Sequence, residues 1–195
     1  MNKEQVLVAA VALIAGLLIG YMFFSSKAEK LQMNAQLPVG AGSPTDYQAR
    51  IVEAEKMLAK DPKNLQAWIQ LGNDYFDTDQ AQKAISAYGK ALEIQPDNPN
   101  VLTDQGIMHR KMGWYDKAIA NFEKAQSLDP KHLQSLFNMG IVYSQDLKQN
   151  DKALAVLGKY LSMDSTSPTA QQIKAMMEQI KSGTTPPQGM TPGMK

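Results

Sequence analysis

The stretch that decides the fold is residues 65–98, which read LQAWIQLGNDYFDTDQAQKAISAYGKALEIQPDN. Apolar and small residues recur in it at intervals of three and four, a spacing that predicts two amphipathic helices. Residues of the same kinds return in residues 99–132 and again in residues 133–167. A period of this length, held over three copies, predicts stacked pairs of helices in which each pair contacts only its neighbours.

The copies share a fixed order of large and small residues. In the first copy the order is Trp68, Leu71, Gly72, Tyr75, Ala84, Tyr88, Ala91 and Pro96. This order resembles the pattern of the tetratricopeptide-repeat (TPR) family over residues 65 to about 167. The resemblance implies an all-α fold, a right-handed TPR superhelix of stacked helical hairpins. We expect Gly72 and Ala84 to let the helices of a hairpin approach, and Trp68 and Tyr88 to fill the space between hairpins.

Copies two and three depart from this pattern. Gln105 and His109 replace the usual Leu and Tyr, which predicts looser packing in the second copy. In the third copy, Tyr160 occupies a usual alanine place, and a one-residue insertion is expected in the loop at residues 147–150.

Helices are also predicted on both sides of the repeats. Residues 47–64 resemble the second half of a leading repeat, and Ile173, Met176, Met177 and Ile180 form a helical stripe. The stripe predicts a capping helix, since a stacked array leaves its last apolar face uncovered. The predicted organisation is an anchor at 1–27, a linker at 28–46 and a TPR domain at 47–182, followed by a disordered tail at 183–195. Within that domain lie the half-repeat at 47–64, repeats at 65–98, 99–132 and 133–167, and the cap at 168–182.

An uninterrupted apolar run, VLVAAVALIAGLLIGYMFF, occupies residues 6–24. At about 1.5 Å per residue its helical length approaches the hydrocarbon thickness of about 30 Å, which predicts one N-terminal transmembrane helix. A signal peptide cleaved near Ser26-Lys27-Ala28 is the alternative. Lysines flank both ends of the run, so charge alone leaves its orientation open. Gly16 and Gly20 share one helix face, an arrangement that favours a homodimer.

The composition argues against catalysis and nucleic-acid binding. The chain has no cysteine, which excludes disulfides, thiolate metal sites and covalent haem attachment. Its 20 basic and 19 acidic residues give a net charge of +1, without the basic excess that phosphate binding needs. The only histidines are His109 and His132, for which we expect a packed and a capping role. We therefore expect no enzyme activity, no cofactor, no metal and no nucleic acid.

The TPR resemblance implies a concave groove lined by the first helix of each hairpin. Large apolar residues occupy several of its places, which indicates an interaction surface. The expected groove residues are Ile69, Asn73, Phe76, Ile107, Arg110, Gln134, Phe137 and Ile141. Some TPR proteins clamp a terminal carboxylate with basic residues at places where this chain has Ile69 and Asn138. We therefore expect the partner to be an amphipathic helix or an extended apolar peptide of another protein.

The combination of anchor, linker and repeats resembles the membrane-anchored TPR subunits of bacterial c-type cytochrome biogenesis. That resemblance implies a single-pass protein of the bacterial inner membrane. Its periplasmic repeats would hold an apocytochrome or a haem-ligation partner. The alternatives are an assembly factor for a pilus, a secretion system or another envelope complex, a periplasmic chaperone, and a self-assembling structural scaffold.

Overall fold

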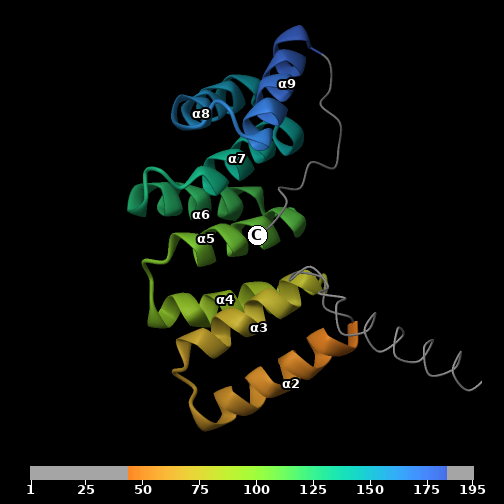
Figure 1. Ribbon diagram of the computed structural model, residues 1–195, viewed down its shortest axis with the longest axis vertical. Coiled ribbons are helices and arrows are strands. Elements are labelled where there is room, and N and C mark those ends of the chain that lie inside the picture. The colour runs from red at the N-terminus through yellow and green to blue at the C-terminus, as the bar shows by residue number, and fades with distance from the viewer. Residues whose placement is uncertain (1–43, 184–195) are drawn as a thin grey trace, which may run out of the picture. The chain divides into compact units, whose positions relative to one another are not determined.

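The computed structural model describes residues 44–183, and this part of the chain is all-α (Figure 1). It contains eight α-helices, one π-helical turn and no strand, which confirms the predicted helical-repeat fold. The elements are α2 (Pro44–Lys60), α3 (Leu65–Asp77), α4 (Ala81–Ile94), α5 (Pro99–Lys111), α6 (Tyr115–Leu128), α7 (Leu133–Ile141), the π-helix η1 (Val142–Asp146), α8 (Asn150–Met163) and α9 (Pro168–Ser182).

The predicted anchor at 1–27 and nearly all of the predicted linker and tail lie outside the described residues. Between residues 44 and 183, no helix combines the length and apolar character needed to cross a membrane.

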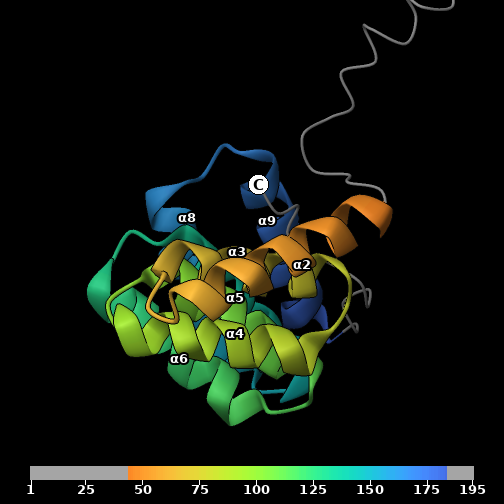
Figure 2. The same ribbon diagram turned by 90° about the horizontal axis from the view of Figure 1, so that it is seen from below.

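Consecutive helices pack against one another along the chain, and α3–α4, α5–α6 and α7–α8 form the three hairpins. Seen along the stack, α3 and α5 lie to one side of α4 and α6 (Figure 2). The first helices therefore share one face of the array, and α5 also contacts α7 directly.

A capping side chain precedes the first helix of each repeat and also helix α9. Asn64, Asn98, His132 and Ser167 accept hydrogen bonds from the backbone N–H three residues later, at 3.0 to 3.3 Å. Such caps satisfy N–H groups that have no partner within the helix. The expected capping role of His132 is confirmed, with its Nδ1 3.3 Å from the Ser135 nitrogen.

A glycine in every first helix lies against a large side chain of the second helix in the same hairpin. A Cβ added to Gly72 would lie 2.5 Å from the Tyr88 ring, and one on Gly106 would lie 2.5 Å from Phe122. In the third hairpin, Gly140 faces Leu157 in the same way, at 2.4 Å. Tyr88 therefore packs on the glycine within its own hairpin, and it belongs to the same core cluster as Val101 and Met108 of the next one.

The one-residue insertion of the third repeat lies in η1 and not in the expected loop at residues 147–150. The Leu147 N–H donates to the Val142 carbonyl at 2.9 Å, a bond across five residues that widens the helix by one residue. Lys148 then takes the left-handed conformation (φ 55°) that Asp79 and Gly113 take in the other two hairpin loops. The three loops are therefore alike, because the helix end absorbs the additional residue.

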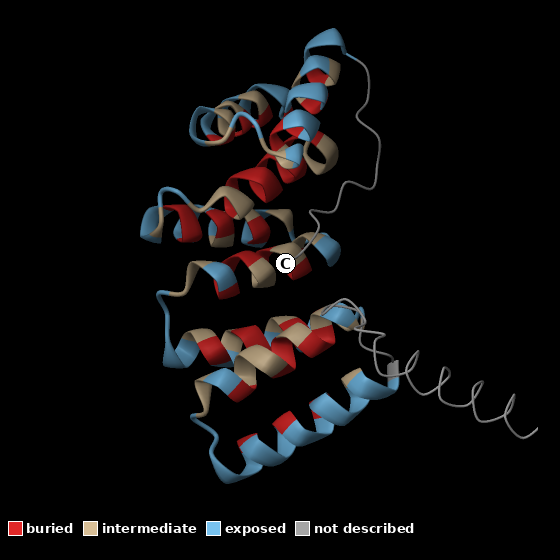
Figure 3. Cartoon of the chain, in the orientation of Figure 1, coloured by how far each residue is buried: buried red, intermediate tan, exposed pale blue. Residues whose placement is uncertain are grey.

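Helices α2 and α9 cover the two ends of the array, but they do so unequally (Figure 3). The stripe predicted for the cap is largely buried: Ile173 and Met176 are 0% exposed and Ile180 is 6% exposed. On α2 the buried apolar residues are Ile51, Ala54 and Leu58.

Candidate peptide-binding groove

The expected groove residues lie on the first helices, as the repeat pattern predicts, but they differ in accessibility. Six of the eight are partly buried, namely Ile69, Asn73, Phe76, Ile107, Arg110 and Gln134. The other two, Phe137 and Ile141, are 1% and 0% exposed. The structure therefore leaves the α3 and α5 part of the expected surface open and buries most of the α7 part.

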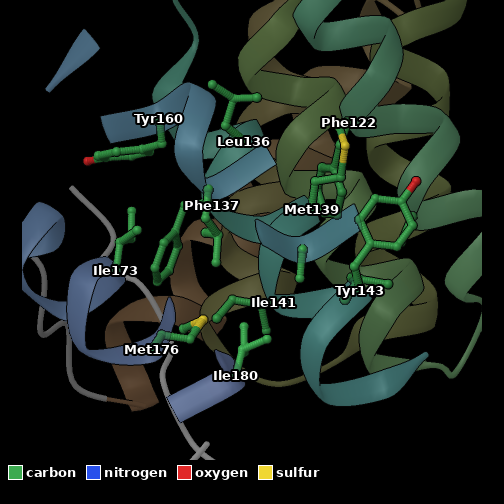
Figure 4. Close-up of a cluster of buried hydrophobic side chains, with 14 of the residues drawn as sticks. Phe122, Leu136, Phe137, Met139, Ile141, Tyr143, Tyr160, Ile173, Met176 and Ile180 are labelled. Carbon is green, nitrogen blue, oxygen red and sulfur yellow. The ribbon is translucent and has the colours of Figure 1, made fainter. Parts of the chain in front are cut away.

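Phe137 and Ile141 belong to the hydrophobic core, and their assignment to a peptide-binding surface is wrong. Figure 4 shows Phe137 beside Ile173, and Ile141 close to Met176 and Ile180 of α9. The reason is that α9 occupies the place next to α7 that an additional repeat would take. Its apolar stripe needs burial, and these two side chains of α7 provide the surface for it.

Three large apolar side chains remain half-buried on the first helices: Ile69 and Phe76 of α3, and Ile107 of α5. All three pack against the core of the first two repeats, and Ile107 also packs against the core of the third. Each presents one side to the core and keeps a part accessible. This strip is the apolar component of the candidate site.

Asn73 lies between this strip and the core of its hairpin. The Tyr88 hydroxyl donates to Asn73 Oδ1 at 2.9 Å, so the amide fixes a phenol that is 1% exposed. Burial raises the pKa of Tyr88, and the charges of Asp104, Asp77 and Asp74 raise it further. Negative charges of both α3 and α5 therefore act on this one hydroxyl.

Asp104 also lies on this face and was not predicted from the sequence. Burial, and secondarily the charge of Asp77, raises its pKa to about 7. It occupies the sixth place of its repeat, counted from Pro99, on the helix face that carries Ile107 one turn later. The helical spacing that puts Asp104 one turn before Ile107 was the signal in the sequence that could have identified it.

The carboxylates of α3 have partners from α2. Both Arg50 Nε, at 2.8 Å, and its terminal NH₂ group bond Asp74 Oδ1, and Asp74 is 0% exposed. Gln70 adds two hydrogen bonds to the same carboxylate, at 3.1 and 3.2 Å. The Tyr47 hydroxyl hydrogen-bonds Asp77 and lowers its pKa, although burial raises that pKa by more.

Arg110, expected as a groove residue, is tied to the next hairpin. Its Nε donates to Asp146 Oδ2 at 2.5 Å, and a terminal nitrogen donates to Gln145 Oε1 at 3.2 Å. Both acceptors lie in η1, the π turn that holds the inserted residue. Lys111 pairs in turn with Asp79 of the preceding hairpin. Ion pairs therefore join the end of α5 to the hairpin before it and to the hairpin after it.

Gln105 and His109, the two departures in repeat two, take part in its packing. Gln105 donates to the Ile85 carbonyl at 3.0 Å, which ties α5 to the preceding hairpin. His109 is 7% exposed and lies against Trp114, with ring centroids 5.6 Å apart. Its Nδ1 is buried without a hydrogen-bond partner among the described residues, and burial lowers its pKa. His109 therefore has the packed role that we expected.

Two hollows lie outside this face. One of about 390 Å³ is bordered by α2, α3 and α4, with Trp68 and Glu55 in its wall. The other, of about 350 Å³, lies at the hairpin loops around Trp114 and Leu147. In the described part of the chain, no group of three acidic or histidine side chains is placed to hold a metal ion.

Comparison with known proteins identifies the repeats. Family models described as tetratricopeptide repeat match residues 63–131 and 134–167, together more than half of the chain. A mouse (Mus musculus) protein, Protein O-mannosyl-transferase TMTC1, is 31% identical over an alignment of 96 residues that covers 45% of this chain and 10% of that protein. Anaphase-promoting complex subunit 3 of Schizosaccharomyces pombe is 28% identical over 57% of this chain and 17% of its own length. The chain thus spans only a small part of these relatives.

Solved structures share the fold. The crystal structure of MamA has a TM-score of 0.63 at 21% identity, covering 71% of this chain and 84% of that one. The first TPR of Spaghetti (RPAP3), bound to the HSP90 peptide SRMEEVD, has a TM-score of 0.57 at 17% identity, covering 63% of this chain and 94% of that one. Proteins with this fold generally mediate protein–protein interaction. The chain belongs to the tetratricopeptide-repeat family.

Proposed function

We propose that this protein is a membrane-anchored, non-catalytic scaffold that binds an apolar or amphipathic segment of another protein on the face formed by α3 and α5. The observation that carries the proposal is the half-buried strip of Ile69, Phe76 and Ile107. These side chains come from the first helices of adjacent hairpins, the face on which the family resemblance places a peptide. Such a strip offers area to a partner without the cost of ordering a loop.

The partner differs in kind from the acidic peptide SRMEEVD in the RPAP3 structure. Binding that peptide's carboxylates would require basic side chains, whereas this face presents Ile69 and Asp104. An apolar segment fits the described surface better.

The finer assignment is a role in c-type cytochrome maturation at the bacterial inner membrane, with the repeats in the periplasm. The apolar run at residues 6–24 and the architecture support it. An enzyme fused after Lys181 that works only in the cytoplasm should then be inactive, and strong reporter activity would contradict this orientation. Capture of a pilus or secretion component in place of an apocytochrome would redirect the assignment to envelope assembly.

The binding face is tested by comparing Ile107→Ser with Ile94→Ser in the full chain in detergent. Ile94 ends α4 and is 39% exposed, so the same chemical change is made outside the proposed face. We expect Ile107→Ser to weaken partner capture about tenfold, because a loss of about 1.4 kcal/mol of apolar burial is a tenfold loss in affinity. Equal capture by both variants, with both folded, would refute the proposed face.

A further inference from the structure

The α3–α5 face, defined by Ile69, Asn73, Phe76, Asp104 and Ile107, combines an apolar strip with a carboxylate, that of Asp104, which has no partner among the described residues. We propose that it selects partner segments in which a lysine or arginine stands next to an apolar side chain, and that Asp104 receives the cation. This inference rests on the proposed function, because it specifies the chemistry of the partner on the same face.

Asp104 is partly buried, and none of the described residues gives its carboxylate a hydrogen bond or an ion pair. The side chains in the same place of the other repeats are both bonded. Gln70 donates to Asp74, and Asn138 donates to the Gln134 carbonyl at 2.8 Å. The repeat architecture therefore does not by itself leave this position without a partner.

The nearby cations of the array have other partners. Arg50 bonds Asp74, Lys111 bonds Asp79, and Arg110 bonds Asp146. Around Asp104 the remaining field is negative, because Asp77 is the charge that acts on its carboxylate. Charge complementarity consequently calls for a cation that comes from outside the array.

An ionised carboxylate at a partly buried site loses part of its hydration, and a second negative charge adds repulsion. Burial and Asp77 raise the pKa of Asp104 to about 7, as expected from these two effects. A lysine or arginine of the partner would remove both costs by restoring a charged hydrogen bond.

The apolar strip determines what stands beside that cation. Ile107 follows Asp104 by one helical turn on the same face of α5. A lysine or arginine that reaches Asp104 lays its aliphatic stem along this surface. The next partner side chain then meets the strip of Ile69, Phe76 and Ile107, where an apolar residue is favoured.

The test is selection of a random 12-residue peptide library against the full chain in detergent micelles. We expect the enriched peptides to carry lysine or arginine next to a large apolar residue. Asp104→Asn keeps the shape of the side chain but removes its charge, and it should weaken the best peptide about tenfold. Asp104→Lys should select acidic peptides instead. The matched control is Asp116→Asn at the start of α6, which should bind as the unmodified protein does.

The outcomes separate this inference from the proposed function. Peptides that lose affinity with Ile107→Ser but lack a basic residue, or tolerate Asp104→Asn, would refute the selection of a cation and retain the binding face. Peptides insensitive to both changes would place the site elsewhere and contradict both proposals. Absence of any enriched peptide would also contradict both.

Discussion

The glycine of the second hairpin offers the sharpest test of how the helices pack. A Cβ on Gly106 would lie 2.5 Å from Phe122 Cε1 and 3.0 Å from Cδ1 and Cζ. Carbon atoms in contact prefer about 3.5 to 4.0 Å, so the ring would have to move by about 1 Å. Phe122 is 0% exposed and cannot turn into solvent. Gly106→Ala should therefore be destabilising.

The magnitude follows from two opposing effects. Overpacking a core costs about 1–3 kcal/mol, whereas replacing a helical glycine by alanine contributes about 0.5–1 kcal/mol of stability. Gly89→Ala on α4 is the control, because its Cβ would meet only Gln105 Nε2, at an ordinary 3.5 Å. We expect Gly89→Ala to stabilise the protein, and Gly106→Ala to have a free energy of unfolding about 1–3 kcal/mol lower than that control.

Urea unfolding followed by tryptophan fluorescence measures this difference. The chain has two tryptophans, Trp68 and Trp114, which belong to the first and second hairpins. In the background of Phe122→Ala, which alone costs about 3–5 kcal/mol, Gly106→Ala should become neutral or stabilising, because the methyl enters the space left by the ring. If Gly106→Ala equals Gly89→Ala in stability, the close approach of α5 and α6 is wrong.

Three further predictions concern charge and capping. The pKa of Asp104 is raised to about 7 from an ordinary 3.8, so between these pH values the folded protein keeps a proton that the unfolded chain has lost. The melting temperature should therefore fall as the pH rises from 3.8 to about 7. The variant Asp104→Asn should abolish this fall. Ile173→Ala in α9, at a side chain that is 0% exposed, should lower the free energy of urea unfolding measured by circular dichroism by about 2–5 kcal/mol, whereas the partly exposed Met177→Ala should cost clearly less. Arg110→Met and Asp146→Asn should each cost about 1 kcal/mol in the same assay, and a double variant that costs the full sum would show that the two groups do not interact.

The repeat spacing was sufficient to predict the helices and hairpins because it records a packing requirement. A small residue in each first helix must face a large one in the second, and the pairs Gly72–Tyr88 and Gly106–Phe122 meet in the structure. The spacing could not place the insertion, because a π turn uses backbone hydrogen bonds that no side chain specifies. The bond from Leu147 to Val142 is of this kind.

The candidate site was only partly predictable. Ile107 is half-buried on the face where its position in the repeat predicted it, and Asp104 lies one helical turn before it on the same face. What sequence alone could not give is the pairing of charges. Arg110 has the charge of a ligand-binding residue, but its contact with Asp146 depends on how η1 directs the following hairpin loop. Such long-range contacts follow from the folded geometry and not from the repeat register.

The burial of Phe137 likewise follows from the folded geometry, because α9 is rotated about its own axis relative to the first helix of a repeat. When α9 is numbered from Pro168 as the first helix of a repeat, polar residues such as Gln171 and Lys174 occupy the positions that pack within a hairpin in the repeats. Its apolar residues Ile173 and Met176 stand instead at the sixth and ninth places, which in the repeats belong to the groove. Among the described residues α9 is the last helix, and this other face of it is buried against Phe137 and Ile141 of α7. Groove places therefore stay accessible only where the next first helix keeps the register of the repeat, which α5 does and α9 does not.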